Sequence, residues 1–553
     1  MSDEMKHECA VALLRLRGAG GDGAAALSLL LEKQHNRGQD GAGAATLSLD
    51  PEPRSPAWRI FKCAGPNPLA ELLGRLARRG GRGESVFLGH LRYATYGKGD
   101  ETFCHPFVHA SPRLDRTLLL AGNFNLANAG ELFGSFRAAG NHPSCAADGY
   151  LVCEMLALEL ERLAPAAPGG PPPVLGALRA VLPRLDGAFT LCGMTGDGWS
   201  FAVRDARGIR PGWHFESPDA VAVASERPAI QAAFDAPPEA VRELPPGEAL
   251  LVSPGGDAVF ERVLEPQPLR SCAFERIYFS RANDADIHRE RRALGSALAR
   301  PVLREIGNDL ENAFFGYVPN SAQVAFHGLL EALWTEGLAE GRPVRFGQIA
   351  VKDAKFRTFI ADDAVRSGLR KHVYDVTYGL VRPGSDTLVV LDDSIVRGNT
   401  MRGALLPMLD RLGPRRIVVA SSAPPVRYPD CYGIDMSTLD ELVAFRALCE
   451  LLGTSAGDEL RAALDGGAPD PLAALYARFT EEEHAAAIAR LLAPPGMKAG
   501  VSVVFQTVGA LRAACPGSSG DWYFTGRYPT PGGYRVLRRA LENHLSRRSG
   551  RTY

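Results

Sequence analysis

The chain has 553 residues, of which 46% are hydrophobic, so it can form packed cores in about two to four domains. Its 62 Lys and Arg residues balance 63 Asp and Glu residues, which excludes the strong positive field of a nucleic-acid-binding or membrane-surface protein. The chain contains no run of about eighteen apolar residues, which a bilayer span would need. Its ten scattered cysteines indicate reduced thiols. We therefore expect a cytoplasmic protein that binds neither nucleic acid nor membrane.

The first predicted element is a strand at Ala10 to Leu14, directly after Cys9. The preceding residues, MSDEMKHE, lack the basic and long apolar regions of a signal peptide. By itself, Cys9 would be interpreted as a small hydrophobic core residue.

Further along, polar residues stand among glycines and apolar flanks, a pattern expected of strand-end loops that meet at a pocket. The segments are QHNRGQDGAG (34–43), GHLRYATYG (89–97), AGNFNLANAGEL (121–132) and ADGYLV (147–152), followed by DARGIRP (205–211), VASERPAI (223–230) and LPPGEALLV (244–252). Their order and spacing resemble the glutaminase domain of class II, or amino-terminal nucleophile, glutamine amidotransferases. The resemblance implies an αββα sandwich over the first half of the chain.

The resemblance also implies roles for particular residues. Cys9 is the implied nucleophile, Arg92 the partner of the glutamine α-carboxylate and Asp148 the acceptor from its α-ammonium group. Asn123 and the backbone N–H of Phe124 are the implied oxyanion hole. Many relatives have glycine at the position of Phe124, so this assignment requires that Phe124 does not adopt a positive φ.

In this family the α-amino group of the nucleophilic cysteine takes the thiol proton. An α-amino group titrates at about 7.7 to 8.0, whereas an amide nitrogen within the chain has no useful basicity. We therefore expect residues Met1 to Glu8 to be a leader that is removed, leaving Cys9 at the amino terminus.

The middle of the chain contains three further segments of interest. CAFERIYFSRANDADIHRERRALGSALA (272–299) resembles an interdomain region, and YVPNSAQVAF (317–326) occupies the place of a Pro-Glu-Thr-Ser turn in relatives. VKDAKFRTFI (351–360) resembles a pyrophosphate-contacting segment, in which Lys352 and Arg357 are the best matches for ligand contacts. A solvated basic strand end is the alternative interpretation of that segment.

The segment TLVVLDDSIVRGNT (387–400) combines a buried-strand pattern with paired carboxylates and a phosphate-sized loop. Its apolar, β-branched start is typical of a central parallel strand, and open α/β sheets bind ligands at the carboxyl ends of such strands. Asp392 and Asp393 suit ribose hydroxyls or a hydrated Mg²⁺ ion. The loop, which suits a phosphate monoester, consists of Ser394, Ile395, Val396, Arg397, Gly398, Asn399 and Thr400. A helix is expected from about Thr400 to Gly413, with Pro407 as a source of distortion.

This segment resembles the phosphoribosyl pyrophosphate (PRPP) motif of type I phosphoribosyltransferases. A class II glutaminase followed by such a transferase is the organisation of the amidophosphoribosyltransferase family, and the likeness extends through IVVASSAPPVRYPDCYGIDM (417–436). The resemblance implies glutamine-dependent amination of PRPP to 5-phosphoribosylamine, the first step of purine synthesis, with Mg²⁺ at Asp392 and Asp393 neutralising the departing pyrophosphate.

The expected fold class is therefore mixed α/β and α+β. We predict a glutaminase domain over 9–265, a transferase domain with a parallel sheet over 266–452, and a helical carboxyl-terminal extension over 453–553. The family is often oligomeric, so a homo-oligomer is expected.

Some members of the family hold a four-iron, four-sulfur cluster with four cysteines. At two of those places this chain has Gly520 and Tyr523, which supply no thiolate, while Cys272 falls at one remaining place and Cys431 lies near the other. We therefore expect no iron–sulfur cluster.

Two alternative functions stay open at this stage. A PRPP-binding regulator could keep Asp392 and Asp393 without the chemistry, although it would not need Cys9, Arg92, Asn123 and Asp148 together. An ammonia-only transferase with an inactive glutaminase would follow if the leader were never removed.

Overall fold

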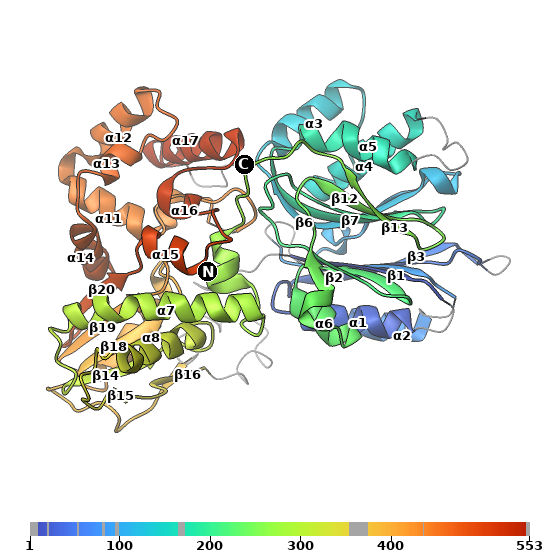
Figure 1. The fold of residues 1–553 in the computed structure, drawn as a ribbon. Coiled ribbons are helices and arrows are strands. Elements are labelled where there is room, and N and C mark those ends of the chain that lie inside the picture. Colours follow the sequence, from blue (N-terminus) through green and yellow to red (C-terminus); the bar gives the residue numbers. More distant parts are fainter. Residues whose placement is uncertain are drawn as a thin grey trace.

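The computed structural model describes residues 9–18, 22–51, 55–79, 83–94, 99–163, 172–352, 374–434 and 436–548, with no side chain described for Arg79, Lys352 and Tyr374. These residues form an N-terminal half (9–262) and a C-terminal half (285–548), joined by the connecting segment 263–284 (Figure 1). None of the helices in these ranges has both the length and the apolar character that a bilayer crossing requires.

Two antiparallel sheets form the centre of the N-terminal half. The first has the order β11-β9-β10-β1-β4-β2-β3 and the second the order β13-β12-β8-β7-β6-β5. The strands are β1 (Ala10–Leu16), β2 (Gly41–Leu47), β3 (Trp58–Cys63), β4 (Val86–Arg92), β5 (Phe107–His109), β6 (Leu118–Leu126), β7 (Gly187–Thr195), β8 (Ser200–Arg204), β9 (Trp213–Glu216), β10 (Ala220–Ala224), β11 (Val241–Glu243), β12 (Glu248–Val252) and β13 (Ala258–Arg262).

Helices cover the outer faces of these sheets, which gives the predicted αββα sandwich (Figure 1). The first sheet is covered by α1 (Gly23–Lys33), α2 (Pro68–Arg79) and α6 (Arg227–Phe234); the second is covered by α3 (Ala129–Ala138), α4 (Asp148–Arg162) and α5 (Pro173–Val181). Strand β1 explains the apolar run after Cys9: Ala12 and Leu14 pack toward the helices, while Val11 and Leu13 pack between the sheets.

The C-terminal half is built on a parallel sheet of order β15-β14-β18-β19-β20. Its strands are β14 (Ala313–Tyr317), β15 (Arg345–Phe346), β18 (Thr387–Asp392), β19 (Arg416–Ser421) and β20 (Gly500–Phe505), and β16 (Ala350–Lys352) with β17 (Tyr374–Val376) forms a separate antiparallel pair. Because β18 lies at the centre, its apolar run is buried on both faces, as predicted.

Helices lie on both faces of this parallel sheet. One face packs on α7 (Ala285–Glu305) and α8 (Gln323–Thr335), and the other packs on α10 (Leu406–Asp410), α11 (Val443–Leu452) and α14 (Glu481–Leu492). Gly295 and Gly328 allow α7 and α8 to approach closely, since an added Cβ would lie 1.6 Å from the carbonyl oxygen of Ala325 or 2.0 Å from that of Arg292.

Further helices belong to the C-terminal half, and short 3-10 and π-helical turns occur along the chain. They are α12 (Ala456–Asp465), α13 (Ala473–Tyr476), α15 (Val508–Ala514), α16 (Trp522–Thr525) and α17 (Pro531–Leu545), with short 3-10 helices at Glu101–Phe103, Leu114–Arg116, Leu182–Arg184, Pro238–Ala240, Leu439–Glu441 and Gly453–Ser455 and π-helical turns at Glu275–Phe279 and Met401–Leu405.

One prediction for the C-terminal half needs correction. Residues 453–553 are not purely helical, because β20 joins the edge of the parallel sheet beside β19. The helix expected from about Thr400 is present and runs through the π-helical turn Met401–Leu405 into α10, with Pro407 in the first turn of α10. Proline lacks the N–H that a regular α-helix would use, and the π-helical turn before it is the expected distortion.

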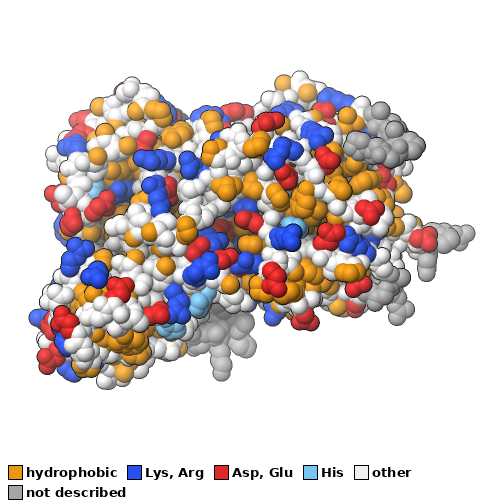
Figure 2. All heavy atoms as spheres, viewed as in Figure 1, with side chains coloured by type: hydrophobic (Ala, Val, Ile, Leu, Met, Phe, Trp, Pro, Cys, Tyr) orange, Lys and Arg blue, Asp and Glu red, His pale blue; other side chains and the backbone are white. Residues whose placement is uncertain are grey.

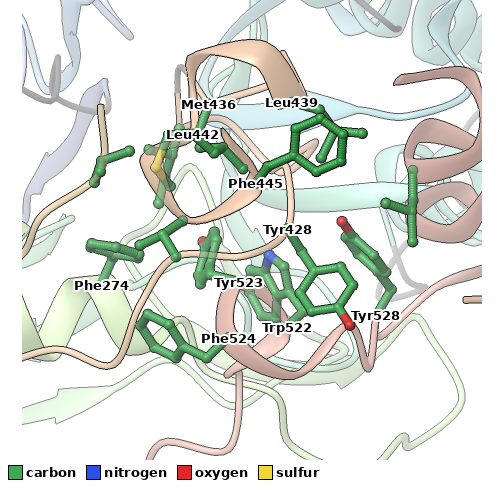
Figure 3. Close-up of a cluster of buried hydrophobic side chains, with 14 of the residues drawn as sticks. Phe274, Tyr428, Met436, Leu439, Leu442, Phe445, Trp522, Tyr523, Phe524 and Tyr528 are labelled. Atoms are coloured by element: carbon green, nitrogen blue, oxygen red, sulfur yellow. The ribbon is translucent and has the colours of Figure 1, made fainter. Parts of the chain in front are cut away.

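A buried aromatic cluster lies where the two halves meet. It brings together Phe274 from the connecting segment, Tyr428 from the loop after β19, and Trp522, Tyr523 and Phe524 from α16 (Figure 3). Ala188 and Ile209 of the N-terminal half belong to the same cluster. The halves therefore share a common core.

The surface, by contrast, carries Lys and Arg side chains interspersed with Asp and Glu, as Figure 2 shows for one face.

Candidate active sites

Cys9 lies directly before β1, in the middle of the first sheet between β4 and β10. Its Sγ accepts a hydrogen bond from the backbone N–H of Tyr93 at 3.4 Å. Burial raises the pKa of the Cys9 thiol to about 11, although the Tyr93 N–H and the Arg92 charge oppose the shift. The thiol is therefore protonated near neutral pH, and a nucleophilic attack by it needs a base.

A pocket of about 230 Å³ opens beside Cys9. Its lining contains all of the residues that the sequence assigned to glutamine chemistry: Cys9, Arg92, Asn123, Phe124 and Asp148. Cys9 directly precedes β1, Arg92 ends β4, and Asp148 begins α4, while the other two residues lie within β6. The fold therefore brings together residues that are far apart in the chain. Residues 1–8, the predicted leader, lie outside the described residues.

Asn123 and Phe124 lie on β6 in a geometry that suits an oxyanion. The Asn123 side chain is 3% exposed, and its Nδ2 has no hydrogen-bond acceptor among the described residues. Phe124 is not among the residues with positive φ, so the backbone strain considered from the sequence does not arise. The N–H of Gly122 donates away from β7, and because alternate N–H groups of a strand point to the same edge, the N–H of Phe124 also points away from β7.

Arg92 and Asp148 place opposite charges in this pocket. Arg92 ends β4, and its guanidinium lies 5.6 Å from the ring centroid of Phe103. Asp148 is the first residue of α4, where its Oδ1 accepts from the N–H of Gly149 at 2.9 Å. A guanidinium and a carboxylate match the two charged groups of a free amino acid.

A second, larger pocket of about 780 Å³ lies at the carboxyl end of β18. Its lining includes Asp392, Asp393 and the loop residues Ser394, Ile395, Val396, Arg397, Gly398 and Thr400. Asn399 instead lines a separate surface groove with Arg402 and Arg411. Gly398 has φ 76°, a left-handed conformation that favours glycine. The predicted loop thus surrounds the pocket except at Asn399.

The two carboxylates differ in their surroundings. Burial raises the pKa of Asp393, and hydrogen bonds from Ser321 and Ser394 oppose that shift. Ser394 Oγ donates to Asp393 Oδ1 at 2.9 Å, while the N–H of Asp393 donates to Asp392 Oδ1 at 2.9 Å. No group of three or more His, Cys, Asp and Glu side chains within the described ranges could hold a metal. Paired carboxylates alone still suit Mg²⁺, which commonly keeps waters and takes its other ligands from substrate phosphates.

Other predicted contacts cannot be placed in this pocket. Lys352 ends β16, and its side chain is not described; Arg357 lies outside the described residues. The segment at 317–326, whose ligand contacts the sequence left open, contributes Pro319, Asn320 and Ser321 to the lining.

The N-terminal half forms part of the wall of this second pocket. Glu32 in the last turn of α1 and Asn36 in the turn that follows α1 line it together with the connecting-segment residues 278–283 and Arg291 of α7. Burial lowers the pKa of Arg291 to about 10, so it remains cationic at neutral pH.

A buried ionic network lies next to this wall. Arg37 Nε is 2.8 Å from Glu226 Oε1, and Arg37 Nη2 is 2.7 Å from Glu275 Oε2. All three side chains are at most 5% exposed. Each belongs to a motif quoted from the sequence, but only the fold shows that they meet. No periodicity or spacing in the chain could have indicated this network, since Arg37 and Glu275 are separated by 238 positions.

The positions at which some family members have cysteine ligands of an iron–sulfur cluster make other contacts in this chain. Cys272 forms an isolated β-bridge with Gly520, and its Sγ is 3.2 Å from the hydroxyl of Tyr523. Trp522 Nε1 donates to Asp430 Oδ1 at 3.0 Å, beside these residues in the aromatic cluster (Figure 3). A glycine and a tyrosine at two ligand places do not fit a cluster that needs four thiolates.

Curated proteins with similar sequences from several bacteria are named amidophosphoribosyltransferase. The protein from Haemophilus influenzae is 30% identical over 382 residues, which cover 66% of this chain and 72% of that protein. The protein from Bacillus subtilis is 32% identical over 378 residues, which cover 67% of this chain and 71% of that protein. No protein-family model matches the chain.

The fold is similar to that of a solved structure named as glutamine PRPP amidotransferase from B. subtilis, complexed with ADP and GMP. The two align with a TM-score of 0.68 at 24% sequence identity, over 94% of this chain and 97% of the other. The likeness extends over both halves and the segment that connects them.

Proposed function

The chain belongs to the amidophosphoribosyltransferase family, the glycosyltransferase-type enzymes of the first step in purine biosynthesis, and we propose that its two pockets divide that reaction between them. The pocket at Cys9 releases ammonia from glutamine. The pocket at β18 transfers that ammonia to carbon 1 of PRPP, giving 5-phosphoribosylamine and pyrophosphate.

In the first pocket, Cys9 Sγ attacks the side-chain amide carbon of glutamine. The thiol is protonated at neutral pH, so its proton must pass to a base. The α-amino group of Cys9 is that base once Met1 to Glu8 have been removed. The proton then moves to the leaving nitrogen, and ammonia departs. Water hydrolyses the thioester to glutamate.

The observation that carries this assignment is the buried donor of Asn123. Its Nδ2 lies in the same small pocket as Cys9 and has no acceptor among the described residues. A buried donor without an acceptor is costly unless a ligand satisfies it. The oxyanion of a tetrahedral intermediate at Cys9 would accept from Asn123 Nδ2 and from the N–H of Phe124. Arg92 and Asp148 would hold the α-carboxylate and α-ammonium groups.

In the second pocket, Asp392 and Asp393 accept from the ribose hydroxyls of PRPP. The loop from Ser394 to Thr400 supplies N–H and hydroxyl donors for the 5′-phosphate. Asp392 and Asp393 would also hold Mg²⁺, which supplies charge neutralisation for the departing pyrophosphate when it is bound. Arg291 adds positive charge to the lining of this pocket.

An ammonia-only transferase is the second candidate, because it needs only the β18 pocket. The test is to measure the intact mass of the purified protein and then glutamate and pyrophosphate release with glutamine, PRPP and magnesium. Loss of residues 1–8 with release of both products supports the proposal. A retained leader with activity on ammonium alone supports the second candidate. A homo-oligomer in the cytoplasm remains a prediction.

A further inference from the structure

Two histidine rings stack on one another next to β6, the strand that carries Asn123. His90 lies on β4 and is fully buried; His105 precedes β5 and lines the Cys9 pocket. Their ring centroids are 4.1 Å apart, and the ring planes differ by 9°. Neither residue has a part in the reaction as described above.

The two rings bind the polar groups on either side of Gly122. The N–H of Gly122 donates to His105 Nδ1 at 3.2 Å, and the carbonyl of Gly122 lies 3.1 Å from His90 Nε2. Gly122 directly precedes Asn123 and Phe124. The two histidines therefore hold both peptide planes that flank Gly122, the residue directly before the predicted oxyanion hole.

These contacts fix the tautomer of each ring. A backbone N–H is only a donor, so His105 Nδ1 must accept and its proton sits on Nε2. A carbonyl is only an acceptor, so His90 Nε2 must carry the proton and donate. His90 Nδ1 is then a lone pair, and it has no hydrogen-bond partner among the described residues. Burial lowers the pKa of His90 to about 3 and that of His105 well below its usual value, so both rings are neutral.

The register of the second sheet explains why a side chain is needed here. β5 pairs with β6 through Phe107 and Leu120, and the same register carried further would place His105 opposite Gly122. The β5 strand has ended before that position, and the imidazole supplies the acceptor for the N–H of Gly122. The N–H of Phe124, two residues further on, points to the same open edge.

His105 also links this strand to Asp148. A Cβ on Gly149 would lie 2.9 Å from His105 Cε1 and 3.1 Å from Nε2, so the glycine beside Asp148 admits the ring. The imidazole thus lies between the strand with the oxyanion donors and the start of α4.

We propose that His90 and His105 are positioning residues of the glutaminase reaction, which hold Gly122 so that Asn123 Nδ2 and the N–H of Phe124 point at the developing oxyanion. The proposal rests on the proposed glutaminase function of this pocket. Donors act on the transition state only if they are aimed beforehand, and a misplacement of about 1 Å can cost on the order of 100-fold in rate.

The experiment exchanges each histidine for the two amides, whose polar groups replace different ring nitrogens. Asparagine can supply a polar atom near Nδ1, and glutamine can supply one near Nε2. His105→Asn keeps the acceptor and His105→Gln does not; His90→Gln keeps the donor and His90→Asn does not. Each pair substitutes the same chemical group, so a general loss of packing affects both members similarly.

The protein tested is the chain from Cys9 onward, without residues 1–8. The readouts are kcat and KM for glutamine hydrolysis, the rate of ammonia-dependent synthesis, and the rate of Cys9 alkylation by iodoacetamide. We expect kcat to fall by about 10- to 100-fold in His105→Gln and His90→Asn and to stay within about 3-fold of the parent in His105→Asn and His90→Gln. KM, ammonia-dependent synthesis and alkylation should change little in all four, because they do not require the oxyanion donors.

Three results would overturn the proposal. They are an equal kcat for both amides at each position, a preference for the same amide at both positions, or an effect on KM alone. Failure of the proposed function has a different signature, since the unsubstituted trimmed chain would then release no glutamate from glutamine.

Discussion

The side-chain amide of Asn125 donates to the backbone carbonyl of Cys431 at 2.5 Å, across 306 positions of the chain. Asn125 lies two residues beyond Asn123 on β6, and it lines the same pocket together with Gly433 of the C-terminal half. The pocket that contains Cys9 is therefore completed by the half that contains the loop after β18.

Replacing Asn125 by alanine should impair glutamine use more than ammonia use. A typical hydrogen bond contributes about 0.5 to 1.5 kcal/mol, so we expect kcat with glutamine to fall by about 2- to 12-fold. Steady-state kinetics with each nitrogen source measures this. Asn141→Ala is the matched control, because its side chain also donates to a backbone carbonyl but lies in the turn after α3. Equal loss with glutamine and ammonium would contradict a role specific to the glutamine pocket.

Cys9→Ala should abolish glutamine-dependent synthesis and leave ammonia-dependent synthesis intact. The substitution removes the nucleophile, while the β18 pocket is lined by none of the residues around Cys9. Pyrophosphate release with each nitrogen source is the measurement, and Cys449→Ala on α11 is the control, since Cys449 is also a free thiol. Loss of both activities would refute the division of labour between the pockets.

Replacing both Asp392 and Asp393 by alanine should remove synthesis with either nitrogen source while glutamine hydrolysis persists. Both carboxylates line the β18 pocket, and no other acidic side chain in its described lining except Glu32 could replace them. Calorimetric titration with PRPP and magnesium should show lost binding, whereas Asp458→Ala on the exposed face of α12 should bind as the parent does. Ammonia-dependent product from the double variant would reject the ribose assignment.

The buried network at Arg37 should make the protein acid-sensitive. Burial by itself would raise the pKa of Glu275, but the charge and hydrogen bonds of Arg37 outweigh it and the pKa falls below its usual value. A carboxyl with a lowered folded-state pKa stabilises the fold above its unfolded pKa of about 4.3, and that stability is lost as the pH falls through the folded pKa.

Glu275→Gln tests this directly. Breaking a buried ion pair costs about 3 to 5 kcal/mol, so the variant should be less stable than the parent at pH 7. Its stability should also fall less steeply below about pH 4.3. Urea unfolding at several pH values measures both effects, with Glu482→Gln, exposed on α14, as the control. Parallel pH profiles for the parent and Glu275→Gln would show that this network does not carry the acid sensitivity.

Local patterns in the sequence were sufficient for the elements that carry the chemistry. The apolar runs at β1 and β18 identified buried strands, and the motifs identified the residues that line each pocket, because both signals are contained in a few consecutive positions. Asn399 was the exception among the predicted residues whose side chains are described, since it follows the turn at Gly398 and lines a separate groove.

Contacts between distant segments could not be predicted in this way. The bond from Asn125 to Cys431, the ionic network at Arg37 and the stacked pair His90 and His105 depend on how strands and halves pack. Strand β20 was missed for a related reason: a short apolar segment after Ala-rich helices becomes a strand only because the edge of β19 is available to pair with it.

The most direct test of the account uses protein whose intact mass shows that Met1 to Glu8 are absent. Supplied with glutamine, PRPP and magnesium, it should release glutamate and pyrophosphate in equal amounts, because each ammonia freed at Cys9 is consumed at the β18 pocket. Pyrophosphate formed with ammonium but never with glutamine, in protein already trimmed to Cys9, would contradict it.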